Sequence, residues 1–294
     1  MNELYSLNVG RADCHVLFLD TSGSSRRQCL LIDCGWYPPS SSHALISFLK
    51  AHHVQVIDLM IITHLHMDHL AALPDLASHL QVKRIIAPTG QMIPVTDAIC
   101  QTQPGNKYLL HLKAFREALE GCAAKGTIIE DIMRYAQGGS LSFPSARLTC
   151  LYPTADSPRP SVDYALKMCA PGLSLNDCIA FENQSRKSAN ADSSVWLLES
   201  GGQQQILFMG DAPMISIAPW LREGALHPRL LKIPHHGLAK GYFQPAEILA
   251  LAPEHLLVCA DPSKEQAMND CRRLAERCGA SIHFTFDGDF HWKF

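Results

Sequence analysis

The chain has few charged side chains, and it has no long run of basic residues or of apolar residues. Charged residues make up 18% of its 294 residues, and no block of five or more Lys or Arg occurs. The net charge at pH 7 is −3, so charge gives no support for a nucleic-acid partner. No apolar stretch approaches the roughly 18 residues that a membrane-spanning helix needs. We therefore expect a protein without a membrane segment.

The cysteines of the chain are not closely paired in the sequence. Its 11 Cys form no Cys-x-x-Cys pair, and most lie in apolar stretches. An odd number of such residues indicates reduced core thiols. Residues 1–4 carry no basic region followed by an apolar run, so we expect no signal peptide and a cytoplasmic location. Hydrophobic residues make up 47% of the chain, enough for a sizeable core.

The most informative stretch has the form His-x-His-x-Asp-His and follows an apolar strand predicted over 57–62. Imidazole and carboxylate are good ligands for zinc, manganese and iron. On a tight turn, His64 and His66 can point at one metal, while Asp68 and His69 can point at a second. The alternative is a polar loop that happens to be rich in His, because the chain has 15. The order of these residues at a strand end favours the metal site.

Two later strand ends carry further candidate ligands. Asp211 follows a strand predicted over 204–209. Two divalent ions held mainly by neutral His need anionic ligands, so Asp211 is the candidate bridge. His235 and His236 follow a strand predicted over 230–233. One of them would bind the second metal, and its neighbour would contact substrate oxygens. A turn role is the alternative for each strand end.

Other polar residues are candidates for supporting roles. We expect Asp33 either to hold a ligating His through its other ring nitrogen or only to organise its turn. Asn190 and Asp192 precede a predicted hairpin and are candidate ligands of the first metal. Lys232 and Lys240 flank the paired His. A cation there would suit a phosphate oxyanion, although lone lysines are usually solvated.

The order of predicted elements indicates an α/β chain. The first ninety residues are predicted to run β-β-β-α-β-α-β, and residues 193–286 again place strands before helices. Residues 91–145 differ, because prolines interrupt their beginning and 107–122 is predicted to be an amphipathic helix. We expect 91–145 to be a helical insertion or a lid. Residues 128–135 fit a strand or a helix, and 153–171 is predicted to be a surface loop.

Taken together, these residues resemble the metallo-β-lactamase superfamily. Within it, the chain is similar to the soluble hydrolase domain of ComEC-type competence proteins and their stand-alone relatives. The His-x-His-x-Asp-His run is specific for the superfamily, and Pro-His-His-Gly points to the ComEC-like branch. The stretches that carry the resemblance are 7–13, 31–35, 63–69, 190–194, 209–211 and 233–237.

The resemblance implies a four-layer αββα sandwich, a single domain over 1–294, with a two-metal site on one edge. Superfamily members usually place a further His ligand between the two metal motifs, and this chain has Asn190 or Asp192 there instead. The metal ligands that the resemblance implies are His64, His66, Asp68, His69, Asp211 and either His235 or His236.

The expected function is a hydrolase with two divalent ions, Zn²⁺ or Mn²⁺. Phosphodiesters such as DNA or a nucleotide are favoured because the ComEC-like branch is associated with DNA degradation. Residue chemistry alone fits a small ester, a lactone or a cyclic nucleotide equally well, and a module that binds metal or a protein partner without turnover is the third hypothesis. In the hydrolase, Asp68 would also move a proton, His236 would contact substrate, and Lys240 would take up developing charge.

Overall fold

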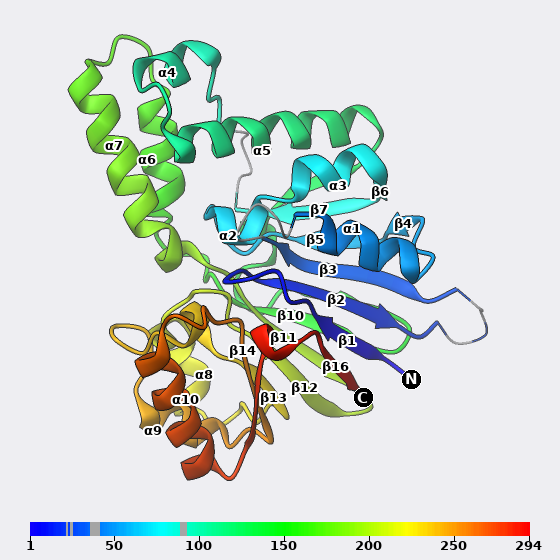
Figure 1. Cartoon of the computed structure of the whole chain (residues 1–294). Helices are drawn as coiled ribbons and strands as arrows, with labels where there is room; N and C mark the ends of the chain where they lie inside the picture. The colour runs from blue at the N-terminus through cyan, green and yellow to red at the C-terminus, as the bar shows by residue number, and fades with distance from the viewer. Residues whose placement is uncertain (22, 24–25, 36–41, 89–92) are drawn as a thin grey trace.

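The computed structural model describes residues 1–21, 23, 26–35, 42–88 and 93–294. Two large β-sheets stack face to face, and helices cover their outer faces (Figure 1). The first two residues of the segment predicted as an insertion, 91–145, lie outside this description.

The first sheet has seven strands within the described residues. Neighbouring strands from β3 to β8 pair in parallel, and the strands on the β16 side pair antiparallel. From edge to edge its strands are β16 (Phe290–Lys293), β1 (Glu3–Ser6), β2 (Cys14–Leu19), β3 (Gln28–Cys34), β5 (Leu59–Ile61), β7 (Arg84–Ala87) and β8 (Ile128–Asp131).

The second sheet also has seven strands in the described part of the chain. Strands β12 to β15 pair in parallel, and β9 to β12 pair antiparallel. From edge to edge its strands are β15 (Ser281–Phe284), β14 (His255–Val258), β13 (Leu230–Lys232), β12 (Gln203–Phe208), β11 (Val195–Ser200), β10 (Arg147–Tyr152) and β9 (Ser140–Ser142). A small separate sheet pairs β4 (Val56–Ile57) with β6 (Gln81–Val82).

Ten α-helices are formed by the described residues, and none of them is both long and apolar enough to cross a bilayer. They are α1 (Ser42–Ala51), α2 (Met67–Leu70), α3 (Leu73–His79), α4 (Asp97–Thr102), α5 (Lys107–Ala124), α6 (Pro160–Met168), α7 (Leu175–Ser188), α8 (Ala218–Arg222), α9 (Pro245–Leu251) and α10 (Glu265–Cys278).

Three groups of buried apolar side chains define the layers. Side chains of a strand point alternately to its two faces, so one strand contributes side chains to two of these groups. In β2, Leu17 packs between the sheets with Trp196 and Phe208, whereas Val16 packs outward under α1, α3 and α5. Helices α9 and α10 cover the outer face of the second sheet, where Leu207 is buried. The chain is therefore an αββα sandwich, and the predicted fold class is confirmed.

The segment predicted as an insertion contains both helices and strands. Helices α4 and α5 occupy its first part, and the predicted helix over 107–122 is confirmed by α5. Strands β8 and β9 then add an edge strand to each sheet. Residues 128–135, for which strand and helix were both open, form β8 and a single 3-10 turn. The division of the chain into domains stays a prediction.

The prediction of a surface loop over 153–171 is wrong, because this stretch contains helix α6. Pro160 stands at the first position of the helix, where a missing N–H breaks no hydrogen bond. The next turns bury Val162, Ala165 and Met168 in the same apolar group as α5. Pro and Ser therefore marked the start of a helix here rather than a loop.

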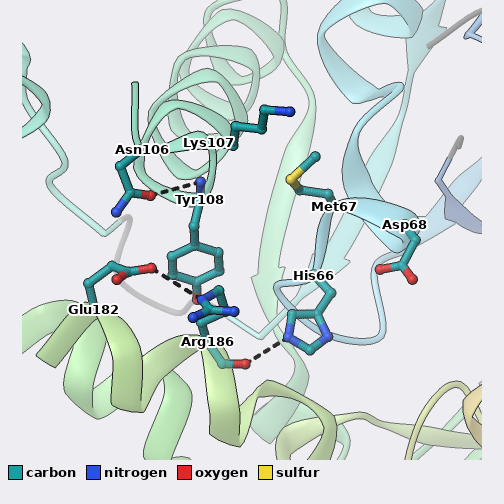
Figure 2. Close-up of a pocket in the computed structure, with 8 residues that line it drawn as sticks. All are labelled: His66, Met67, Asp68, Asn106, Lys107, Tyr108, Glu182 and Arg186. Atoms are coloured by element: carbon teal, nitrogen blue, oxygen red, sulfur yellow. Dashed lines mark hydrogen bonds and ion pairs between the residues drawn. The ribbon is translucent and has the colours of Figure 1, made fainter. Parts of the chain in front are cut away.

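Helix α7 has no counterpart in the predictions. Its buried residues are Cys178, Glu182 and Ser185, so no apolar periodicity marks it. Helices α6 and α7 lie together beside the N-terminal end of α5, on the side of the sandwich where α2 also lies (Figure 1). Figure 2 shows His66 close to Tyr108 of α5 and Arg186 of α7.

Candidate metal centre

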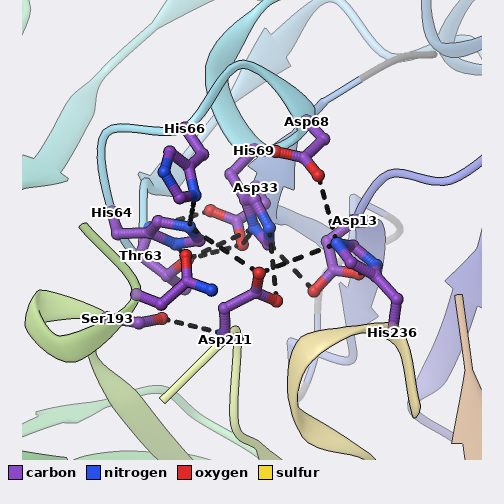
Figure 3. A network of polar contacts seen from close by, with 12 residues as sticks. Asp13, Asp33, Thr63, His64, His66, Asp68, His69, Ser193, Asp211 and His236 are labelled. Carbon is purple, nitrogen blue, oxygen red and sulfur yellow. Dashed lines mark hydrogen bonds and ion pairs between the residues drawn. The ribbon is translucent and has the colours of Figure 1, made fainter. Parts of the chain in front are cut away.

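Polar ends of strands from both sheets meet at one edge of the sandwich (Figure 3). The turn 63–69 follows β5 of the first sheet, while Asp211 and His236 follow β12 and β13 of the second. Asp13 precedes β2, which runs antiparallel to its neighbours. Because parallel strands end at the same edge of a sheet, these residues converge although most are far apart in sequence.

Two glycines allow this convergence. A Cβ atom at Gly35 would lie only 1.7 Å from the carbonyl oxygen of Asp68. Gly210 has a φ of +51°, and a Cβ atom there would lie 2.4 Å from the Ser193 Oγ. A side chain at Gly35 would push the Asp68 backbone away, and one at Gly210 would clash with the Ser193 and Thr63 side chains, so each glycine lets a site-bearing turn pack tightly.

A first triad consists of His64, His66 and Asp211, whose ligand atoms all lie within 4.8 Å of one another. The His64 Nε2 is 3.1 Å from the His66 Nδ1 and 3.9 Å from the Asp211 Oδ2. The His66 Nε2 donates a hydrogen bond to the carbonyl oxygen of Arg186 at 2.8 Å. That bond leaves the His66 Nδ1 facing the triad.

A second triad consists of Asp68, His69 and His236, again with ligand atoms within 4.8 Å. The His236 Nε2 lies 3.1 Å from the Asp68 Oδ2. Asp211 lies between the two triads, because its Oδ1 is 3.5 Å from the His69 Nε2 and its Oδ2 is 3.7 Å from the His236 Nε2. The carboxylate thus occupies the position expected of a bridge.

Hydrogen bonds behind the second triad fix its two imidazole rings. The His69 Nδ1 donates to the Asp33 Oδ2 at 2.7 Å, and the backbone N–H of Thr63 donates to the other Asp33 oxygen. The His236 Nδ1 donates to the carbonyl oxygen of Cys259 at 2.8 Å. Each bond sets the ring orientation and directs the remaining nitrogen into the cluster, which is the contact expected of Asp33.

A buried ion pair lies against the same cluster. The Lys232 ammonium contacts the Asp13 carboxylate and donates to the carbonyl oxygen of Gly210 at 2.8 Å. Both side chains are fully buried. Burial would raise the pKa of Asp13, but the charge of Lys232 holds that pKa well below its ordinary value. The Asp13 carboxylate also lies 3.6 Å from the His236 Nδ1 and 3.8 Å from the His69 Nδ1.

Sequence analysis missed the role of Asp13. It lies within the stretch 7–13 that carries the family resemblance, but its partner was not apparent. The available signal was Lys232, a lysine inside the apolar run Leu-Leu-Lys-Ile. A lysine on such a strand is buried only when a carboxylate compensates its charge.

The residues present fit divalent metal ions. Buried polar atoms normally have hydrogen-bond partners, yet within the described residues His69 Nε2, Asp211 Oδ1 and Asp13 Oδ1 have none. Imidazole nitrogens and carboxylate oxygens that converge in this way can bind a divalent cation, and this mixture of ligands suits Zn²⁺ or Mn²⁺. The two triads are therefore the groups that would hold two such ions, with Asp211 shared.

Of the paired histidines, the structure brings His236 into the cluster. The His235 ring instead lies against Tyr242, with ring centroids 3.8 Å apart. Burial lowers the pKa of His235 to about 4. Both histidines have a positive φ, 48° at His235 and 54° at His236, so the tight turn sends adjacent side chains in different directions. His235 is in neither triad.

Three other predicted site residues also lie outside the triads. The Asp192 carboxylate accepts a hydrogen bond from the Ser161 N–H at 2.9 Å, at the start of α6, and burial raises its pKa to about 6. The Asn190 Nδ2 donates to the Tyr242 hydroxyl at 2.7 Å. Lys240 is exposed and lines a separate surface pocket with Asp270.

Comparisons with known proteins identify relatives of part of the chain. It is 24% identical over 221 residues to ComE operon protein 3 of Bacillus subtilis, covering 74% of this chain and 21% of that protein. It is 30% identical over 66 residues to endoribonuclease YSH1 of Candida albicans, covering 22% of this chain and 7% of that protein. The chain therefore spans only a small part of the length of these relatives.

Two solved structures align along most of the chain. A diphosphatase from the PhnP family aligns with a TM-score of 0.49 and 10% identity, covering 100% of this chain and 98% of that one. The metallo-β-lactamase MIM-1 from Novosphingobium pentaromativorans aligns with a TM-score of 0.39 and 13% identity, covering 94% and 91%.

Residues 10–125 match the family model of the metallo-beta-lactamase superfamily. That region contains Asp13, Asp33 and the whole turn 63–69, which supplies four of the side chains in the two triads. The rest of the chain completes the second sheet and contributes Asp211 and His236 from strand ends. The chain is thus similar to the metallo-beta-lactamase superfamily over residues 10–125, and its buried His/Asp clusters lie at the edge of an αββα sandwich.

Proposed function

We propose that this protein is a phosphodiesterase that acts on nucleic acid or nucleotide strands with the help of two divalent ions. The observation that carries the proposal is the shared position of Asp211. Its carboxylate lies within 4 Å of His64, His69 and His236. Two ions held so close together suit in-line displacement at phosphorus, because both the attacking and the leaving oxygen carry charge there.

Two further observations favour a phosphodiester over a small ester. A pocket of about 510 Å³ opens beside His66 and Asp68, and Lys107 and Arg186 are among its lining residues. Cations at the mouth of a site attract an anionic substrate. One relative of part of the chain is named an endoribonuclease, which is an enzyme of this reaction class.

The chain's own residues have separate tasks in this proposal. When bound, the ions would act as Lewis acids and lower the pKa of a bound water to about 7. Asp211 is buried, with 2% of its side chain exposed, and would serve only as a ligand. Asp68 is 26% exposed and lines the pocket, so it can also exchange a proton with the reacting oxygens. The His236 Nε2 lies beside it and orients its carboxylate.

The experiment is a substrate comparison with metal-free protein reloaded with Mn²⁺ or Zn²⁺. The substrates are bis(p-nitrophenyl) phosphate, p-nitrophenyl acetate, a cyclic nucleotide and labelled single- and double-stranded DNA and RNA. We expect metal-dependent diester cleavage that is lost in Asp68→Ala. The matched control is Asp75→Ala, which removes an exposed carboxylate on α3.

Two outcomes would contradict the proposal. Faster turnover of the acetate than of any diester would assign the site to small esters. Metal binding without turnover of any substrate would favour a module that binds metal or a partner.

A further inference from the structure

The pocket beside the first triad has walls from three parts of the chain (Figure 2). The turn 63–69 forms one wall, the start of α5 a second, and α7 the third. Its volume of about 510 Å³ lies within the roughly 300–1,000 Å³ of typical small-molecule pockets. It is lined by His66, Met67, Asp68, Asn106, Lys107, Tyr108, Glu182 and Arg186.

Buried hydrogen bonds hold these walls together. The Tyr108 hydroxyl of α5 is 2.8 Å from the Ser185 Oγ of α7, and that Oγ donates to the carbonyl oxygen of Ser161 on α6. On the other side, His66 donates to the backbone of Arg186 at 2.8 Å. The pocket is therefore preformed and fixed to the candidate metal site, which lowers the ordering cost of binding.

The charged groups on the α5 and α7 walls leave one net positive charge. Lys107 and Arg186 are cations, and Glu182 is a carboxylate. The Arg186 Nε lies 3.4 Å from the Glu182 Oε1, so Glu182 neutralises one of the two cations. Within the described residues, Lys107 is in no ion pair with a carboxylate. Asp68 also lines the pocket, and its charge would be compensated by a bound ion, so the two helical walls leave one positive charge for the single negative charge of a phosphodiester.

We infer that this pocket is a subsite for the phosphate next to the scissile one in a single-stranded oligonucleotide. Lys107 and Arg186 are its specificity-determining residues. The inference rests on the proposed function, because the scissile phosphate must lie at the triads for its neighbour to reach these cations. Charged donors form the strongest hydrogen bonds with phosphate, and arginine can bind it with two N–H groups.

The test compares short substrates that differ by one phosphate. Thymidine dinucleotide is offered without a terminal phosphate, with a 5′-phosphate and with a 3′-phosphate, beside bis(p-nitrophenyl) phosphate. We expect one of the two phosphorylated dinucleotides to have a KM about tenfold lower than the unphosphorylated one, as a charge-assisted contact would give. Equal KM values for all three dinucleotides would overturn the inference.

Variants assign the effect to the two cations. Lys107→Ala and Arg186→Ala should each remove most of this KM advantage. Arg186→Lys should restore part of it, since it retains the charge. The matched control is Lys187→Ala, which removes an exposed cation adjacent in sequence that does not line the pocket. A KM advantage that persists in both alanine variants would place the phosphate elsewhere.

A binding measurement separates this inference from the proposed function. Fluorescent 5′-phosphorylated oligothymidylate is titrated into metal-loaded protein and into the Lys107→Ala and Arg186→Ala variants. Suppose that oligothymidylate binding weakens in both variants but no diester is cleaved. That result would support the phosphate subsite and contradict the proposed phosphodiesterase activity. Diester cleavage with oligothymidylate binding unchanged in both variants would support the proposed phosphodiesterase activity and contradict the phosphate subsite.

Discussion

The two triads share Asp211 but differ in what supports them. The second triad is supported from within the sandwich, by Asp33 behind His69 and by the Cys259 carbonyl behind His236. In the first triad, His66 is held by the backbone of Arg186, which belongs to helix α7. The His64 Nδ1 lies 3.1 Å from the Thr63 Oγ1 inside the sandwich. The second triad is therefore organised by the sheets alone, while the first also depends on helix α7, which holds His66.

This difference predicts unequal metal affinity. Rings fixed by hydrogen bonds from a rigid scaffold lose little freedom when they bind an ion. A ring held by a helix that buries few apolar side chains is less rigidly placed and should bind more weakly. We expect the second triad to bind its ion more tightly than the first.

Asp211→Asn should remove the shared part of both sites. The amide keeps the size of the side chain but loses the charge that compensates both ions. We expect less than one bound ion per chain and diester hydrolysis lowered about 10³-fold, or ~4 kcal/mol in the barrier. Metal content by mass spectrometry and initial rates measure both effects. Retention of two ions would refute the bridging role.

Asp13→Asn should lower the stability of the fold beside the second triad. It leaves the Lys232 ammonium buried without its carboxylate, and breaking a buried pair from one side costs about 3–5 kcal/mol. Urea unfolding of the metal-free protein measures the loss. The double variant Asp13→Leu/Lys232→Met should recover most of it, because it removes both charges. An unchanged midpoint in Asp13→Asn would mean that the pair contributes nothing.

Asp33→Asn should weaken the ion of the second triad more than that of the first, because Asp33 contacts His69 directly and reaches His64 only through Thr63. An amide in place of the carboxylate no longer accepts from His69 with full charge. Loss of such a supporting contact typically lowers metal affinity about 10–100-fold. Competition with a chromophoric chelator resolves the two binding steps. If both steps weakened equally, the triads would not be independently supported.

Tyr108→Phe should affect only the first triad. The change removes the hydroxyl that contacts Ser185 and loosens α7, and with it the carbonyl that holds His66. A hydrogen bond contributes about 1 kcal/mol, so we expect about fivefold weaker binding of the weaker ion. The control is Tyr164→Phe on α6, a half-buried tyrosine whose ring stacks on Phe181. Equal effects from both variants would argue against a link through α7.

Local patterns predicted much of the fold. Periodic apolar residues marked a helix that the structure contains, α5, and strand ends marked where polar side chains gather. Helices α6 and α7 escaped prediction because α6 begins in a Pro- and Ser-rich stretch and α7 buries mostly polar residues. Asp192 shows the same limit, since it accepts from the start of α6 instead of facing the triads.

The local sequence was enough to predict candidate metal ligands in the turn 63–69. The spacing of His64, His66, Asp68 and His69 after a buried strand predicts a metal site, because ligand type and a tight turn are local properties. Only the tertiary structure decided which of His235 and His236 joins that site, and that Asp13 meets Lys232. Those outcomes depend on backbone conformation and on strands from two sheets meeting at one edge, and no local pattern encodes contacts between residues more than two hundred positions apart.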